Sequence, residues 1–244
     1  MRWSWIKSLG KNLSKTPNCF IVNEAVNFDK KCIFVAVPKT GSTTVRSQMR
    51  QLGVPLIENP HLNIIQIRDA LYVYLLKEAL GKNKRFPTSN VLADAEIRQK
   101  ARETFDGFFK FSAVRNPWAR AVSLYFRREG VKTSEGISFE EFCKHHWYSS
   151  DTCSHPTLHQ NQFDWLSDEN GELIMDYVFK LEDFDKAAHE IAEKTNNRIR
   201  LIKKNANQNP QSRSDSYKDM YTEKTRKLIA KRFEKDIDEF KFIF

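Results

Sequence analysis

The sequence contains no apolar run long enough to cross a membrane. Residues 63–80 come closest, but charged residues interrupt them. Residues 1–15 lack the apolar stretch and the small-residue cleavage site of a secretion signal. We therefore expect no integral membrane segment.

Cysteine is also scarce, with 4 residues in a chain of 244. So few cysteines do not form a disulfide scaffold in a chain of this length, and a cytoplasmic location is the expectation. Several Cys and His residues lie within residues 143–159, but their spacing follows no zinc signature. We therefore expect no metal site.

Negative charge is in short supply as well. The sequence has 40 Lys and Arg residues against 31 Asp and Glu residues, a formal net charge of +9. This surplus suits a ligand rich in phosphate or sulfate, although a basic surface can also serve solubility alone. The hydrophobic content of 40% suits a globular chain. We expect an N-terminal arm at residues 1–30 and a single α/β domain at residues 31–244.

Strand and helix patterns alternate along the chain. Strands are predicted at residues 31–37, 108–114 and 176–181. Helices are predicted at residues 43–52, 63–80, 93–105, 117–128 and 138–147, after the third strand as far as 194, and from 222 onward. Gly53 and Gly81 are expected to end the first two helices. The alternation predicts a mainly parallel sheet covered on both faces, with ligands at the C-terminal ends of its strands.

The turn between the first strand and its helix carries the first chemical signal. It reads VPKTGSTT over residues 37–44. The amide groups and the positive dipole end of the helix meet there. Gly41 lets the backbone approach an anion closely, while Lys39 adds a positive charge and the hydroxyl side chains add hydrogen-bond donors. The sequence of this turn therefore predicts a binding site for a phosphate-like group. The alternative interpretation is an ordinary turn in which Ser and Thr only cap the helix.

The same turn lacks the signature of a nucleotide triphosphate loop. That signature places lysine after the second of two glycines, whereas Lys39 precedes the only glycine of this turn. A nucleotide-dependent kinase with a degenerate phosphate loop is therefore the weaker enzyme hypothesis.

The second signal follows the second strand and reads Arg115-Asn116-Pro117. Arg115 lies where such sheets bind ligands, and its planar guanidinium can hold a phosphate through two hydrogen bonds. Asn116 can cap the helix that Pro117 begins. Arg120 and Ser123 fall on the same helical face as Asn116, so their side chains can point towards Arg115. Arg120 can equally point to solvent.

Together, the two segments resemble the paired signatures of sulfotransferases that use 3'-phosphoadenosine 5'-phosphosulfate (PAPS) and release PAP. The chain is similar in particular to the family that holds many bacterial members and the Golgi carbohydrate sulfotransferases of animals. The resemblance covers most of the chain from Lys31 onward, including residues 160–184 and 207–240. It implies a P-loop-like three-layer αβα fold around a central, mainly parallel sheet.

The resemblance also implies roles for individual residues. The first segment holds the 5'-phosphosulfate in that family, and the second holds the 3'-phosphate. The implied cofactor-binding residues are Lys39, Thr40, Gly41, Ser42, Thr43, Thr44, Arg115 and Ser123. Lys203, Lys204 and Arg213 are candidates for a loop that closes over the nucleotide. Lys39 is also expected to act in catalysis, by stabilising the departing phosphate.

The general base departs from the family pattern. Many relatives have a histidine just before the helix that begins here near Ala93, where this chain has Ser89-Asn90-Val91. A base must reach the acceptor and have a pKa near neutrality. The candidates are His61, Asp94, His155 and His159, of which His61 and His155 are favoured. Asp94 would serve only if burial raised its pKa.

The combined hypothesis is transfer of a sulfuryl group from PAPS to a hydroxyl of a carbohydrate or small metabolite. The non-enzymatic alternative is a polyanion-binding module built on the basic C-terminal region. The phosphate-suited residues lie at predicted strand ends, whereas nucleic-acid binders present an exposed basic stripe with aromatic residues. We therefore expect no nucleic-acid partner.

Overall fold

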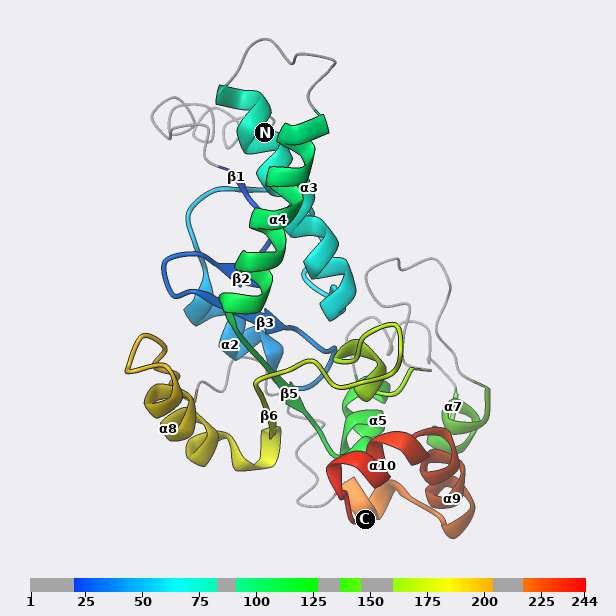
Figure 1. Ribbon diagram of the computed structural model, residues 1–244. Coiled ribbons are helices and arrows are strands. Elements are labelled where there is room, and N and C mark those ends of the chain that lie inside the picture. The colour runs from blue at the N-terminus through cyan, green and yellow to red at the C-terminus, as the bar shows by residue number, and fades with distance from the viewer. Residues whose placement is uncertain (1–19, 83–90, 127–136, 146–159, 204–216) are drawn as a thin grey trace, which may run out of the picture.

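The computed structural model describes residues 20–82, 91–126, 137–145, 160–203 and 217–244 (Figure 1). Its main sheet has the order β2-β3-β5-β6. These strands are β2 (Val26–Asn27), β3 (Cys32–Val35), β5 (Phe109–Val114) and β6 (Tyr177–Lys180). β2 is antiparallel to β3, whereas β3, β5 and β6 are mutually parallel. A separate parallel pair joins β1 (Phe20–Ile21) to β4 (Val54–Pro55).

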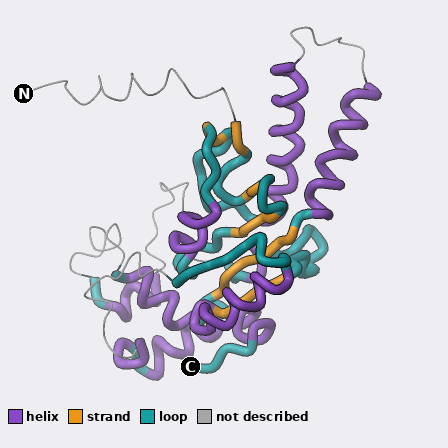
Figure 2. The backbone as a smooth tube through the Cα atoms, turned by 90° about the vertical axis from the view of Figure 1, so that its left-hand side faces the viewer, coloured by secondary structure: helices purple, strands orange, loops and turns teal. Residues whose placement is uncertain are grey.

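The helices lie on both faces of the sheet and beyond both of its ends. They are α2 (Ser42–Met49), α3 (Ile64–Lys82), α4 (Val91–Gly107), α5 (Pro117–Tyr125), α7 (Phe139–His145), α8 (Phe184–Lys194), α9 (Glu223–Arg232) and α10 (Glu234–Phe240). Short 3-10 helices are η1 (Phe163–Trp165), η2 (Leu181–Asp183) and η4 (Tyr217–Met220). Figures 1 and 2 show α3 and α4 projecting side by side from one end of the sheet. Helices α5, α7, α9 and α10 gather at the other end, where β5 finishes (Figure 1).

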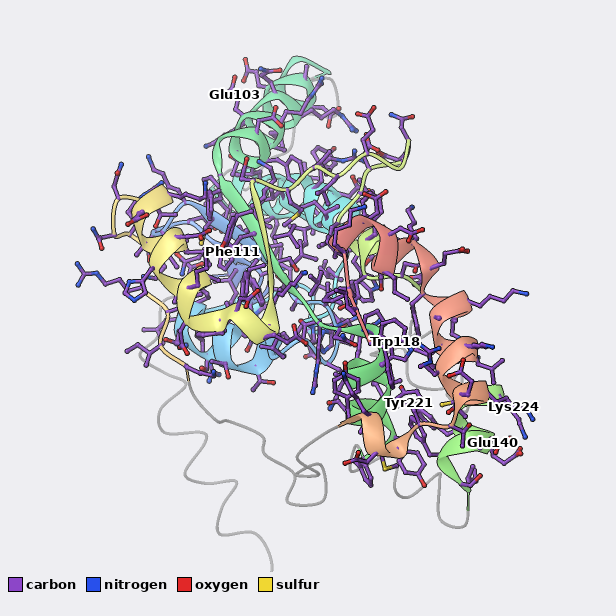
Figure 3. The ribbon with its side chains drawn as sticks, turned by 90° about the horizontal axis from the view of Figure 1, so that it is seen from below. Glu103, Phe111, Trp118, Glu140, Tyr221 and Lys224 are labelled. Atoms are coloured by element: carbon purple, nitrogen blue, oxygen red, sulfur yellow. The ribbon has the colours of Figure 1, made fainter. Side chains whose placement is uncertain are left out.

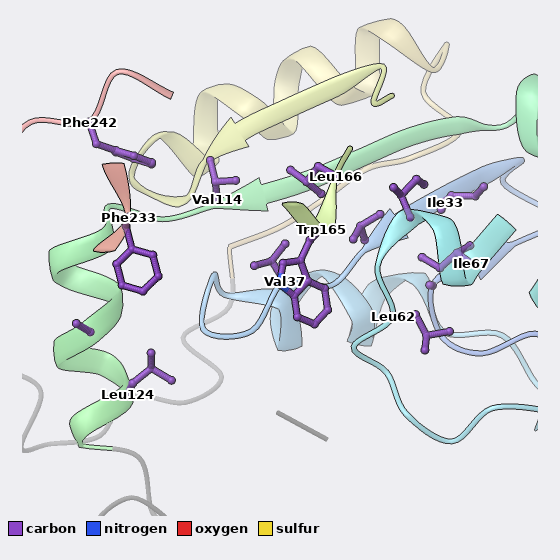
Figure 4. Packing of buried hydrophobic residues seen from close by; sticks show 14 of the residues in the cluster. Ile33, Val37, Leu62, Ile67, Val114, Leu124, Trp165, Leu166, Phe233 and Phe242 are labelled. Carbon is purple, nitrogen blue, oxygen red and sulfur yellow. The ribbon is translucent and has the colours of Figure 1, made fainter. Parts of the chain in front are cut away.

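Strand β3 divides its side chains between two hydrophobic cores. Phe34 belongs to the core that α2 and α8 cover. Ile33 and Val35 belong to the larger core that includes residues of α3 and α5. Figure 4 shows part of this larger core, with Val114 and Trp165 among its members. Because side chains of a strand alternate between faces, a continuous apolar run is buried on both sides. The predicted α/β fold with a mainly parallel, doubly covered sheet is confirmed.

The predicted helix ends were wrong at both glycines. Helix α2 ends at Met49 with Arg50 as its C-cap, so Gly53 lies beyond the helix. Helix α3 continues to Lys82, so Gly81 lies within its last turn. A single glycine does not by itself end a helix, because it costs a helix only about 1 kcal/mol.

The predicted last helix is in fact two helices. The backbone leaves helical geometry at Phe233, whose φ and ψ are −114° and 32°, and this residue separates α9 from α10. Phe233 is buried in the larger core, as its place in the apolar stripe predicted. Asp236 lies in α10, three positions after Phe233, and is fully buried.

The segments near both ends of the described chain pack against the rest of the fold. Near the N-terminal side, Val22 and Val26 are buried in the larger core. The division into an arm and a domain at residue 31 stays a prediction. At the C-terminal side, the Phe244 ring lies edge-on against Trp118 and Tyr221. The Tyr221 hydroxyl donates to the Trp118 carbonyl at 2.9 Å, and Figure 3 shows these two residues as neighbours.

Among the described residues, no helix combines the length and the apolarity needed to cross a membrane. Within the same ranges, no group of three or more His, Cys, Asp or Glu side chains could hold a metal ion. Cys143 is buried, and burial raises the pKa of its thiol to about 12. Residues 146–159, which hold His146, Cys153, His155 and His159, lie outside the described residues.

Candidate active site

The turn from β3 to α2 has an unusual backbone. Lys39 and Gly41 both have left-handed conformations, with φ values of 68° and 72°. Thr40, between them, is fully buried and donates its hydroxyl to the Val37 carbonyl at 2.9 Å. This internal hydrogen bond closes the turn without help from solvent. It leaves Lys39, which is half-buried, at the C-terminal edge of the sheet.

Both packing and conformation favour glycine at position 41. A Cβ added there would lie 2.6 Å from Cδ1 of Leu181, which follows β6. The left-handed φ value would also strain any side chain. Gly41 therefore lets the phosphate-suited turn and the end of β6 pack together.

The turn from β5 to α5 is built differently. The Asn116 side-chain oxygen accepts hydrogen bonds from the amides of Trp118 and Ala119 at 3.1 and 3.3 Å, and Pro117 is the first helical residue. The predicted cap is confirmed. The Asn116 amide donates to a carboxylate oxygen of Glu182 at 3.1 Å.

The two turns meet through two arginines. The Arg115 guanidinium donates from Nη1 to the Lys39 carbonyl at 3.4 Å. Arg120 is buried and donates from Nε to the Pro38 carbonyl at 3.1 Å. Of the two directions left open for Arg120, the structure therefore selects the inward one. Burial lowers the pKa of Arg115, and the negative charge of Glu182 opposes that shift.

Two residues that the sequence did not single out support this junction. Gln162 is fully buried, and its side chain binds both the amide and the carbonyl of Arg115, at 2.9 and 2.8 Å. Asp236 accepts the amide of Gln162 at 2.8 Å. A glutamine and an aspartate among many polar residues carry no local signal of burial, so only the three-dimensional structure identifies them.

The family follows from a match over nearly the whole chain. The model of the sulfotransferase family matches residues 24–243. The chain belongs to the sulfotransferase family. Over 46 residues it is 39% identical to an uncharacterized protein of Archaeoglobus fulgidus, a match that covers 19% of this chain and 38% of that protein's length. No solved structure matches the chain.

In this member of the family, His61 lies at the same edge of the sheet as the β3–α2 turn. Its Nδ1 lies 2.6 Å from the carbonyl oxygen of Ala36, three residues before Lys39. A carbonyl oxygen only accepts hydrogen bonds, so Nδ1 carries a proton. In the neutral ring, the lone pair is then on Nε2, which is the arrangement that a general base needs.

Asp94 does not meet the condition set for it. Its carboxylate accepts from the Tyr72 hydroxyl at 2.5 Å and from Nε of Arg98 at 2.7 Å. These hydrogen bonds lower its pKa, the hydrogen bond from Tyr72 having the larger effect. The condition under which Asp94 would serve as a base is therefore not met, because stabilisation of the charged form makes a carboxylate a weaker base.

Of the remaining candidates, some are described by the structure and others lie outside the described residues. Ser123 is half-buried on α5, and the exposed Lys203 forms an ion pair with Asp185 at 3.4 Å. His155, His159, Lys204 and Arg213 lie outside the described residues.

Proposed function

We propose that this chain transfers a sulfuryl group from PAPS to a hydroxyl of a carbohydrate or small-metabolite acceptor. The contact between Arg115 and the Lys39 carbonyl, at 3.4 Å, carries the proposal. PAPS is charged at two separate positions, its 5'-phosphosulfate and its 3'-phosphate. A protein that grips both must bring two binding segments together, and this contact joins the two segments that suit them.

The residues fit the two charged groups in different ways. The β3–α2 turn suits the 5'-phosphosulfate, because helix amides, hydroxyl groups and the Lys39 ammonium favour an anion. Residues 39–44 belong to this half of the proposed site. Arg115 and Ser123 are assigned to the 3'-phosphate, for which a guanidinium is a preferred partner. Arg213 stays a predicted contribution from the loop before α9.

Two side chains are assigned to the transfer itself. The bond between sulfur and the bridging phosphate oxygen breaks as the acceptor oxygen bonds to sulfur. Lys39 stabilises the charge that collects on the leaving oxygen. His61 accepts the proton of the acceptor hydroxyl through Nε2, because Nδ1–H donates to the Ala36 carbonyl. His155 stays the predicted alternative base, and the cytoplasmic location stays a prediction.

A thermal unfolding experiment with PAP tests the proposal. A ligand at 100 times its dissociation constant stabilises the folded state by about 2.7 kcal/mol. Replacement of Arg115 by Ala removes the charge assigned to the 3'-phosphate, and the affinity for PAP should fall about ten- to hundredfold. Binding by calorimetry measures that change.

Arg198→Ala is the matched control for Arg115→Ala. Arg198 also donates from Nη1 to a backbone carbonyl at 3.4 Å, but that carbonyl belongs to Lys30, just before β3 begins. Its affinity for PAP should equal that of the wild type. If PAP does not stabilise the wild-type protein, the proposed function is wrong, and if Arg115→Ala binds PAP normally, the 3'-phosphate assignment is wrong.

A further inference from the structure

The backbone of Arg115 is held by a single buried side chain. The Gln162 oxygen Oε1 accepts the Arg115 amide at 2.9 Å, and Nε2 donates to the Arg115 carbonyl at 2.8 Å. Gln162 is fully buried and stands 47 positions away in the sequence. The hydrogen-bonding pattern resembles that of a strand partner, although Arg115 follows the last residue of β5. We call this pair of hydrogen bonds from Gln162, together with the support of Asp236 described below, the clamp. It fixes the backbone one residue beyond the end of β5.

Asp236 fixes the orientation of that glutamine. Its Oδ2 accepts both the amide and Nε2 of Gln162, at 2.8 and 3.1 Å, and its Oδ1 accepts the amide of Phe163 at 2.9 Å. If the side-chain amide of Gln162 were turned over, its oxygen would face the carboxylate and its NH2 group would face the Arg115 amide. Both contacts would be repulsive, so only one orientation is stable.

The same carboxylate acts on the second arginine of the junction. Burial raises the pKa of Asp236, and the positive charge of Arg120 is among the influences that oppose this shift. Arg120 in turn donates to the Pro38 carbonyl in the β3–α2 turn. Asp236 is thus hydrogen-bonded to the Gln162 that holds Arg115, and it interacts electrostatically with the arginine that binds the other turn.

A buried carboxylate is a poor means of stabilising a fold. Removing it from water costs several kcal/mol, and well-packed apolar groups often serve stability as well or better. Hydrogen-bonded buried groups do, however, hold their neighbours in one arrangement. A guanidinium that must meet a phosphate through two hydrogen bonds needs a backbone held in that way, because small displacements misalign both bonds.

We propose that Gln162 and Asp236 are positioning residues, which fix the backbone of Arg115 and so set the selectivity of the site for a 3'-phosphate. This inference rests on the proposed function. It predicts that loss of the clamp weakens recognition of the 3'-phosphate while the rest of the nucleotide site stays intact.

The ratio of the affinities for PAP and for adenosine 5'-phosphate tests the inference, because the two ligands differ only in the 3'-phosphate. Calorimetric titration of both ligands measures it. Gln162→Met keeps the volume and loses the hydrogen bonds. We expect this variant to lower the ratio about tenfold, the size typical of a residue that orients a ligand-binding side chain. Its affinity for adenosine 5'-phosphate should change little.

A buried amide at the other end of the sheet is the control. Asn27 donates from Nδ2 to the Met49 carbonyl at 2.9 Å and accepts the Lys30 amide at 2.8 Å. It pairs with Cys32, the first residue of β3. Asn27→Leu loses comparable hydrogen bonds and should leave the affinity ratio at its wild-type value. A general loss of stability would affect both variants alike.

Two further variants complete the test. In an Arg115→Ala background, Gln162→Met should cause no further fall in the ratio if Gln162 acts through Arg115. Asp236→Asn, which is nearly isosteric, should lower the ratio in the same direction and covers the case in which Gln162→Met does not fold. A ratio that falls in Arg115→Ala but stays unchanged in both clamp variants overturns this inference alone. A wild-type protein without preference for PAP overturns the proposed function together with it.

Discussion

The two strand-to-helix turns of the site occupy equivalent positions but expose different groups. They follow the neighbouring parallel strands β3 and β5, in which Val35 pairs with Ser112. In the first turn, the residue before the helix is Gly41, which has no side chain to cap the helix amides. In the second, the Asn116 side chain occupies the amides of Trp118 and Ala119.

This difference determines which groups each turn can use to bind an anion. The first turn can present its helix N-terminus and the dipole behind it. In the second turn, the first amides of the helix are hydrogen-bonded to the Asn116 cap. An anion there would therefore be bound by the Arg115 side chain. Two turns at the same place in one fold are thus suited to two kinds of anion contact, one through the backbone and one through a guanidinium.

The largest expected effect concerns the chemistry at the first turn. His61 contacts Ala36, the residue before that turn, so His61→Gln should remove the base and leave nucleotide binding intact. We expect turnover to fall by about 100- to 10,000-fold, the usual range for loss of a general base. PAP release from PAPS in the presence of sugar acceptors measures the rate, and calorimetry measures the affinity for PAP.

The exposed His189 on α8 serves as the control for that experiment, and His189→Gln should retain full turnover. A His61→Gln variant with normal turnover would contradict the assignment of the base and would favour a base elsewhere, such as His155.

The next effect separates conformation from packing at the first turn. Gly171 has a φ value of 80° with open space where a Cβ would lie, whereas Gly41 has a similar φ value and its Cβ would clash with Leu181. Gly171→Ala should therefore lower the free energy of unfolding by about 1–2 kcal/mol, which is the conformational cost alone. Gly41→Ala should lower the free energy of unfolding by about 1–3 kcal/mol more than Gly171→Ala does, because of overpacking. It should also bind PAP more weakly.

Urea unfolding with and without PAP measures both glycine variants. Equal losses of stability in the two variants would show that Leu181 yields easily, and that the first turn needs glycine for its conformation alone.

The smallest expected effect concerns the second turn. Asn116→Ala removes the helix cap and should lower the free energy of unfolding by about 1 kcal/mol. Asn116→Asp keeps the capping oxygen but loses the Nδ2 donor to the Ile243 carbonyl, so it separates the two contributions. Chemical denaturation measures both. If Asn116→Ala bound PAP more tightly than the wild type, the amides freed from the cap would also bind anions at the second turn.

Local patterns were sufficient to predict both turns. Residues 37–44 were predicted to form a turn between a strand and a helix, and Asn116 was predicted to cap a helix, because these properties depend on residues close together in the sequence. The same reasoning was wrong about where two of the helices end. Gly53 was expected to end a helix that stops at Met49, and one helix was expected where Phe233 separates two.

By itself, the sequence determined the three parallel strands of the main sheet, most of the helices and the residue types at the two turns, since strand and helix periods and caps act over a few residues. The two-residue strands β1, β2 and β4 are too short to show a period, and the sequence did not predict them. Only the tertiary structure decided that Arg120 turns inward, that Asp94 is held as a weak base and that Gln162 and Asp236 clamp Arg115. The contacts between Gln162 and Asp236 span 74 positions. No local period can encode such contacts, because they arise only when distant segments pack and buried polar groups must find partners.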